Sequence, residues 1–258
     1  MILNYKVAGK GQPIVLLHGM AGSLRYWEAY LPLLSKTHKV IAIDLLGYGK
    51  SPQSKGGYTP QEHAQAIRDT LQSLGVQESA TVVGHSMGSL LALKYAVLYP
   101  EEVSKLVLLN MPVYTSPAEA KKDITQSKKV WEYAYYGNSS RALCTTWCRL
   151  LRPLTKHLAP LYLPTVPKAV AQDSLLHTWK SYSESMKHVI ENQTVEADLR
   201  KLTMPVQQIY GSTESKVVLA NVAALSGLPA GVVTQVTEGS HKLPLENPEF
   251  VSLIILKK

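Results

Sequence analysis

The residues best suited to chemistry are the five of Gly84-His85-Ser86-Met87-Gly88. They follow an apolar run over 79–83 that predicts a strand, and they precede a helical pattern over 89–99. A serine in such a sharp strand-to-helix turn requires glycine two positions before it and two positions after it, and both are present. The turn would expose the hydroxyl of Ser86 above a sheet as a nucleophile. Because G-x-S-x-G also arises by chance, its meaning depends on partners elsewhere in the chain.

Two such partners follow in the sequence. A serine hydroxyl is a weak nucleophile at neutral pH and needs an imidazole to take its proton, and we expect His241, in the loop before the last helix, to do so. The imidazole needs a carboxylate to fix its tautomer and stabilise the imidazolium. Glu214 lies in the turn after the strand-like run 206–211, three residues past Gly211. The order along the chain is serine, acid, histidine.

The chain resembles the α/β-hydrolase fold family over nearly its whole length. Four motifs carry the resemblance: His18-Gly19 after the early strand 13–17, the run 44–51 (DLLGYGKS), the turn at Ser86, and Gly239-Ser240-His241 with Glu246-x-Pro248 behind it. The resemblance implies the serine-nucleophile, esterase-like branch with a helical cap. It also implies an oxyanion hole formed by the backbone N–H groups of Met20 and Met87.

The pattern of elements supports this fold separately. Strand-like and helical runs alternate over 38–43, 60–74, 79–84, 87–99 and 103–109, and such alternation indicates a doubly wound, mostly parallel α/β sheet. After residue 111 the alternation stops for about 90 residues rich in helix formers, Trp and Tyr, and it resumes at 204. We therefore expect a core formed by 1–111 and 204–258 and a cap inserted at 112–203.

The acid has alternatives. Family members of this size usually carry aspartate where this chain has Glu214, and a second route in the family places the acid where this chain has Asn110. Because Asn110 has no carboxylate, Glu214 is the expected acid. Asp44 is expected to fix the Gly47-x-Gly49 loop by hydrogen bonding, while His18 and His85 are expected to be structural.

Composition limits the function classes. The 258 residues are 45% hydrophobic, enough for a large core, and the net charge of +8 comes from scattered basic residues without a nucleic-acid-binding module. Neither a signal-peptide pattern at the start nor a run of about 18 apolar residues is present, so we expect a cytoplasmic protein. Cys144 and Cys148 share one predicted helix face and are expected to be reduced packing residues. No cofactor and no metal is expected.

The nucleophile limits the reaction. Family members that open epoxides or remove halides attack with aspartate, and Ser86 cannot form the same ester intermediate. The favoured function is a carboxylesterase acting on small or medium acyl esters through an acyl-enzyme. The alternatives are a C–C bond hydrolase of ring-fission diketones, a lactonase or a perhydrolase with the same triad, and a noncatalytic small-molecule receptor. The oligomeric state stays open. Seven aromatic residues of the cap either line a pocket or pack the cap on the sheet: Trp131, Tyr133, Tyr135, Tyr136, Trp147, Trp179 and Tyr182.

Overall fold

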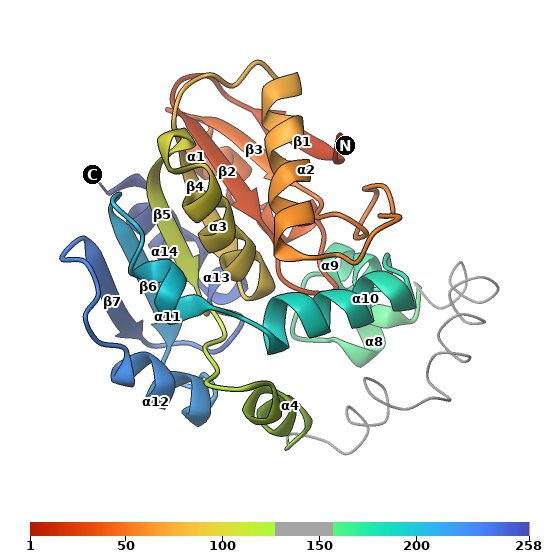
Figure 1. Cartoon of the computed structure of the whole chain (residues 1–258). Coiled ribbons are helices and arrows are strands. Elements are labelled where there is room, and N and C mark those ends of the chain that lie inside the picture. Colours follow the sequence, from red (N-terminus) through yellow and green to blue (C-terminus); the bar gives the residue numbers. More distant parts are fainter. Residues whose placement is uncertain (127–156, 258) are drawn as a thin grey trace.

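A seven-stranded sheet forms the centre of the molecule (Figure 1). The computed structural model describes residues 1–126 and 157–257. The strand order is β1-β3-β2-β4-β5-β6-β7, in which β1 is antiparallel to β3 and the other neighbouring pairs are parallel. The strands are β1 (Tyr5–Ala8), β2 (Pro13–Leu17), β3 (Lys39–Ile43), β4 (Ala80–His85), β5 (Val103–Leu109), β6 (Val206–Gly211) and β7 (Val232–Thr237). The predicted fold class is confirmed.

Helices cover both faces of the sheet, and each face has its own apolar cluster. On one face, α2 (Pro60–Ser73) and α3 (Met87–Leu98) pack against Val15, Leu17 and Ile41. On the other, η1 (Leu24–Trp27), α1 (Leu31–Leu34) and α14 (Pro248–Leu256) pack against Ile14 and Leu16. Because both faces are covered, β2 is buried at every position, which explains its continuous apolar run.

The start of the sheet differs slightly from expectation. The apolar run that begins at Ile2 predicts an early strand, but β1 begins only at Tyr5. Before it, the N–H of Leu3 donates to Thr70 Oγ1 at 2.9 Å and the N–H of Asn4 donates to Ser51 Oγ at 2.9 Å. Side chains of α2 and of the loop after β3 therefore use the N–H groups that a neighbouring strand would need.

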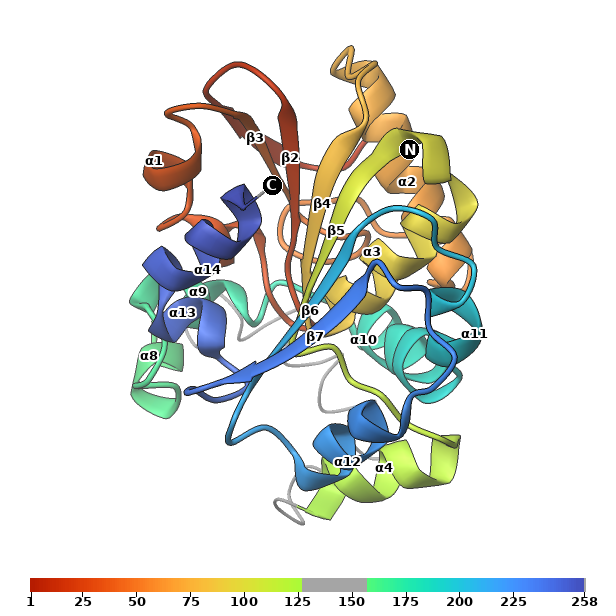
Figure 2. The same cartoon turned by 90° about the vertical axis from the view of Figure 1, so that its left-hand side faces the viewer.

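The named elements described between β5 and β6 are all helical, and turns and loops join them. Its elements are α4 (Pro117–Gln126), α8 (Ala159–Tyr162), α9 (Lys168–Asp173), α10 (Trp179–Ser185), the π-helical turn η4 (Met186–Glu191) and α11 (Val195–Leu199). Figure 1 shows α8, α9 and α10 beyond the ends at which β2 and β4 finish. Figure 2 shows α4 beside α12 (Lys216–Ala224), below β6 and β7. None of the described helices is long and apolar enough to cross a membrane.

Some sequence predictions concern residues outside the described ranges. These are both cysteines and the aromatic residues Trp131, Tyr133, Tyr135, Tyr136 and Trp147.

The short helices η2 (Pro100–Glu102) and α13 (Leu243–Glu246) complete the described elements.

Candidate active site

The turn between β4 and α3 holds Ser86 in an unusual backbone conformation. Its φ of 54° and ψ of −122° lie where side chains are rarely accommodated. Such a conformation costs about 1–3 kcal/mol and persists only when the surrounding structure enforces it. Here the N–H of Ser86 donates to Leu109 O at 2.9 Å and its carbonyl accepts from the N–H of Ser89 at 2.9 Å, so both sides of the turn are fixed.

The flanking glycines are required by close backbone approach. A Cβ at Gly84 would lie 2.3 Å from Gly88 O, and a Cβ at Gly88 would lie 2.4 Å from Leu17 O. Both distances are far below van der Waals contact, and the neighbouring atoms belong to the backbone, which cannot rotate away. The glycine requirement inferred from the sequence agrees with these contacts.

The structure brings Ser86, His241 and Glu214 together. His241 Nε2 lies 3.0 Å from Ser86 Oγ, and His241 Nδ1 lies 2.6 Å from Glu214 Oε2. Only 8% of the Glu214 side chain is exposed, compared with 46% of the His241 side chain. The acid is therefore shielded from water, while the imidazole remains accessible beside the hydroxyl.

Glu214 is held by donors besides the histidine. Asn110 Nδ2 donates to Oε2 at 2.8 Å, and the N–H of Ser215 donates to Oε1 at 2.9 Å. Burial alone would raise the pKa of Glu214, but the hydrogen bonds from His241, Ser215 and Asn110 outweigh it and hold this pKa below its usual value. The group is therefore a carboxylate at neutral pH.

The loop that carries His241 is fixed on both sides. Glu246 Oε2 accepts from the N–H of Ser240 at 2.8 Å, and its other oxygen accepts from the Ser240 hydroxyl. His85 Nε2 lies 2.7 Å from His241 O. The imidazole of His241 is thus attached to a backbone that is tied to α13 and to the nucleophile turn.

Comparison with known proteins identifies the family of this chain. A family model described as alpha/beta hydrolase fold matches residues 12–248. The chain belongs to the α/β-hydrolase fold family. It is 36% identical over 110 residues to a 2-hydroxy-6-oxo-6-(2'-aminophenyl)hexa-2,4-dienoic acid hydrolase of Metapseudomonas resinovorans, a match spanning 42% of this chain and 38% of that protein.

Two further comparisons cover nearly the whole of this chain. It is 28% identical to epoxide hydrolase 1 of Caenorhabditis elegans over 99% of this chain and 67% of that protein. The crystal structure of the enol-lactonase from Burkholderia xenovorans superposes with a TM-score of 0.73 at 20% identity, covering 98% of this chain and 95% of that one. At this identity, the similarity to the enol-lactonase shows a shared fold and nothing more.

The two residues expected to supply oxyanion donors, Met20 and Met87, lie in turns next to Ser86. Met87 is the first residue of α3, so its N–H has no carbonyl one turn earlier in the helix to bond. Met20 follows Gly19 in a turn closed by the Gly22 N–H and Gly19 O at 3.1 Å. A Cβ at Gly19 would lie 3.2 Å from Ser86 Cβ, so this turn packs directly against the serine.

His18 and Asp44 have the structural positions expected of them. His18 Nδ1 lies 2.7 Å from Gly19 O, and its Nε2 accepts from the N–H of Leu45 at 3.0 Å; burial lowers the pKa of this histidine, so the ring is neutral. Asp44 accepts from the N–H of Leu24 at 2.6 Å and from the N–H of Lys50 at 2.8 Å. Both side chains fix loops beside the site.

The segment between β5 and β6 contacts the loops that carry Glu214 and His241. Thr165 accepts from Lys242 Nζ at 2.6 Å, next to His241. The Ser215 hydroxyl, next to Glu214, donates to Asp123 of α4 at 2.7 Å. No local sequence pattern predicts these contacts, because they join side chains more than seventy positions apart.

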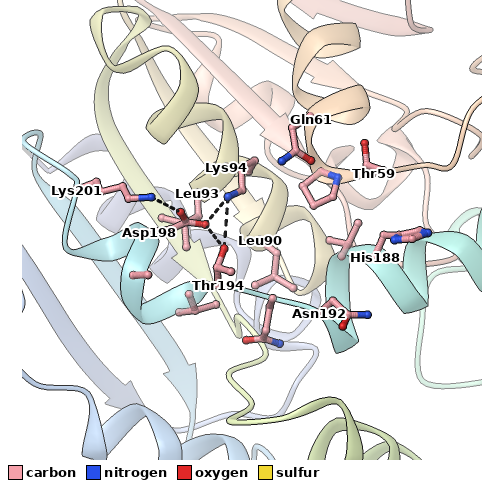
Figure 3. Close-up of a pocket in the computed structure, with 15 residues that line it drawn as sticks. Thr59, Gln61, Leu90, Leu93, Lys94, His188, Asn192, Thr194, Asp198 and Lys201 are labelled. Carbon is pink, nitrogen blue, oxygen red and sulfur yellow. Dashed lines mark hydrogen bonds and ion pairs between the residues drawn. The ribbon is translucent and has the colours of Figure 1, made fainter.

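A separate hollow of about 500 Å³ lies between the amino end of α2, α3 and the segment from η4 to α11 (Figure 3). Leu90 and Leu93 form part of its wall. Its charged groups pair with one another: Lys94 Nζ lies 2.6 Å and Lys201 Nζ 3.5 Å from the carboxylate of Asp198. None of the three site side chains lines it, so we place the chemistry at Ser86 rather than in this hollow.

The described residues were also compared with the ligand sets of metal sites. Over 1–126 and 157–257, no three His, Cys, Asp or Glu side chains are grouped as a metal site would require.

Proposed function

We propose that this chain is a cofactor-independent serine hydrolase that cleaves carboxylic esters with small or medium acyl groups. Ser86 is the nucleophile, His241 the base and Glu214 the acid. The observation that supports this best is the unbroken hydrogen-bonded series from Ser86 Oγ to His241 Nε2 at 3.0 Å and from His241 Nδ1 to Glu214 Oε2 at 2.6 Å.

Glu214 sets the protonation of the imidazole. As a carboxylate it can only accept, so the proton of neutral His241 resides on Nδ1 and the lone pair of Nε2 faces Ser86 Oγ. This tautomer is the one a base needs. When Nε2 takes the serine proton, the imidazolium forms beside a shielded negative charge that stabilises it.

The reaction then proceeds in two halves. Nε2 takes the proton of Ser86 as Oγ bonds to the ester carbonyl carbon, and the carbonyl oxygen becomes an oxyanion that accepts from the N–H groups of Met20 and Met87. Collapse breaks the bond to the alcohol oxygen, which takes the proton from Nε2 and leaves an acyl-enzyme. Water then gives a proton to Nε2 as its oxygen bonds to the acyl carbon. The bond from this carbon to Ser86 Oγ breaks, Oγ takes the proton back from Nε2, and the carboxylic acid leaves.

Residues 112–203 act as the cap in this proposal. Asp123 of α4 bonds Ser215 next to Glu214, and Thr165, between α8 and α9, bonds Lys242 next to His241. These contacts support a role for the segment in shaping the acyl and alcohol subsites. Tyr182 is buried, which favours a packing role for this aromatic residue over direct contact with substrate.

A C–C bond hydrolase is the second candidate. It is favoured by the similarity to the hexa-2,4-dienoic acid hydrolase, and the same serine and histidine could serve it. Epoxide opening is less compatible with the site, despite the similarity to an epoxide hydrolase, because attack by Ser86 on an epoxide carbon would leave an ether that water does not hydrolyse readily.

A substrate panel separates these candidates. Initial rates are measured for p-nitrophenyl acetate, butyrate and octanoate, a simple lactone and a vinylogous ring-fission diketone, with wild type and Ser86→Ala. Ester turnover that Ser86→Ala abolishes supports the proposal. Diketone turnover without ester turnover would replace it with the second candidate, and saturable ligand binding without any turnover would favour a receptor.

A further inference from the structure

His85 lies inside the nucleophile turn and reaches the loop of the proposed base. The residue is 5% exposed, and its Nε2 lies 2.7 Å from the main-chain oxygen of His241. A carbonyl oxygen only accepts, so Nε2 carries the proton and donates it. The residue before the nucleophile is therefore bonded to the backbone of the histidine that must face that nucleophile.

The ring is neutral and has one free nitrogen. Burial, together with the nearby His241, lowers the pKa of His85 to about 3. With the proton on Nε2, Nδ1 is an acceptor, and no partner for it occurs among the described residues. A Cβ at Gly19 would lie 3.1 Å from this Nδ1, so the ring edge packs on the turn that presents the Met20 N–H.

Two aromatic contacts restrict how the ring can turn. Tyr26 stacks on His85 with 4.7 Å between ring centroids and 12° between planes. The centroid of the His241 ring lies 5.1 Å from that of His85, with 55° between the ring planes. The Nε2–H of His85 therefore points in one direction, and its hydrogen bond fixes the backbone oxygen of His241 relative to the ring.

We propose that His85 is a positioning residue that sets the separation of His241 from Ser86 through the hydrogen bond from its Nε2 to His241 O. The proposal rests on the function proposed above, because it assigns a role within that triad. Glu246 fixes the His241 loop from the side of Ser240, whereas His85 fixes it from the nucleophile turn itself. A shift of His241 that lengthens the 3.0 Å contact to Ser86 Oγ would slow proton transfer without changing substrate binding.

The test compares variants that separate the donor from the ring. His85→Phe keeps an aromatic ring against Tyr26 and loses the donor. His85→Gln loses the ring but places an amide nitrogen at about the position of Nε2, whereas the shorter His85→Asn places it near Nδ1. We expect kcat for a p-nitrophenyl ester to fall about tenfold to a hundredfold in His85→Phe and His85→Asn, with KM within about twofold. In His85→Gln we expect kcat within about threefold of wild type.

A spectroscopic measurement reports the geometry directly. In wild type, the proton between His241 Nδ1 and Glu214 is expected as a strongly downfield ¹H NMR signal. It should broaden or move upfield in His85→Phe and persist in His85→Gln. If the ring mattered only for packing, His85→Gln would have a lower melting temperature and a larger loss of kcat than His85→Phe. That result would overturn the proposal. If His85→Phe does not fold, kcat is compared between His85→Gln and His85→Asn. A kcat retained in His85→Gln and lost in His85→Asn supports the proposal, and equal losses in both overturn it.

Ser86→Ala distinguishes failure of this proposal from failure of the proposed function. Turnover that survives in Ser86→Ala refutes the proposed function itself. Turnover that Ser86→Ala abolishes, combined with wild-type kcat and an unchanged downfield signal in His85→Phe, refutes the role of His85 alone.

Discussion

Glu214 illustrates how single residues determine the chemistry of this site. Glutamate is one methylene longer than the aspartate usual in family members of this size, yet its Oε2 lies 2.6 Å from His241 Nδ1. The longer side chain is still fixed in one conformation, because Asn110 Nδ2 and the N–H of Ser215 each donate to one of its carboxylate oxygens. A longer side chain therefore reaches the position that the imidazole requires.

Replacing Glu214 with glutamine removes the negative charge and leaves nearly the same shape. We expect kcat to fall by about a thousandfold to ten-thousandfold, because the amide neither fixes the required tautomer nor stabilises the imidazolium. Steady-state kinetics and circular dichroism would test this, with Glu101→Gln as the matched control at an exposed carboxylate. Near-normal turnover in Glu214→Gln would remove Glu214 from the triad.

Acid should weaken the contribution of Glu214 to stability. Its pKa is lowered in the folded protein, against the opposing effect of burial, so the stabilisation is fully present above the unfolded value of about 4.3 and is lost as pH falls through the folded pKa. The free energy of unfolding of wild type minus that of Glu214→Gln should therefore decrease below about pH 4.3. Urea titrations at pH 6, 4.5 and 3.5 would measure it, and a constant difference would contradict this account.

At the scale of elements, the nucleophile turn is limited by how closely the backbones approach. The start of α3 lies against the end of β2, so that a Cβ at Gly88 would meet Leu17 O at 2.4 Å. Because Ser86, Met87 and Gly88 are consecutive, any displacement of α3 also moves the nucleophile and one proposed oxyanion donor.

Gly88→Ala should therefore reduce both stability and activity. We expect a loss of about 1–3 kcal/mol in the free energy of unfolding, as for overpacked sites, together with reduced kcat. Gly57→Ala is the matched control, since its Cβ would have no neighbour closer than 3.8 Å and should change stability by less than about 0.5 kcal/mol. Chemical denaturation of both variants would test this, and equal effects would contradict it.

Sequence reasoning located the elements better than it located the contacts between them. Strand β5 and the start of α3 agree with expectation, since apolar runs and the glycines of the turn are local signals. The bonds made by the side chains of Asn110, His85 and Glu246 were not predicted, because each depends on how the turns at this edge of the sheet are placed in the folded chain. Asn110 was noticed only as a position without a carboxylate, although its amide bonds the acid.

For the molecule as a whole, the same burial that forms the core also encloses histidines. His63 of α2 is fully buried, its Nε2 lies 3.4 Å from Ser185 Oγ, and burial lowers its pKa to about 3. The folded value lies below the unfolded value of about 6.5, so the unfolded chain binds a proton more readily in this range. The stability that depends on the neutral ring is fully present above about pH 6.5 and is lost as pH falls toward 3.

His63→Phe should therefore reduce the sensitivity of folding to acid. The slope of the free energy of unfolding against pH should fall by up to about 1.4 kcal/mol per pH unit between about pH 6 and 4. His157→Phe is the control, since this histidine is exposed. Denaturation curves across this range would measure the slopes, and an unchanged slope in His63→Phe would show that the buried ring does not resist protonation as described.

Intact-protein mass spectrometry after reaction with a fluorophosphonate probe measures whether Ser86 is an activated nucleophile. The probe bonds stably only to a serine whose proton is taken by a base, beside donors that bind the charge developing on the phosphoryl oxygen. We expect one added phosphonyl group on wild type, on the peptide that contains Ser86, and no label on Ser86→Ala. An unlabelled wild type, or equal labelling of Ser86→Ala, would show that Ser86 is not the activated nucleophile.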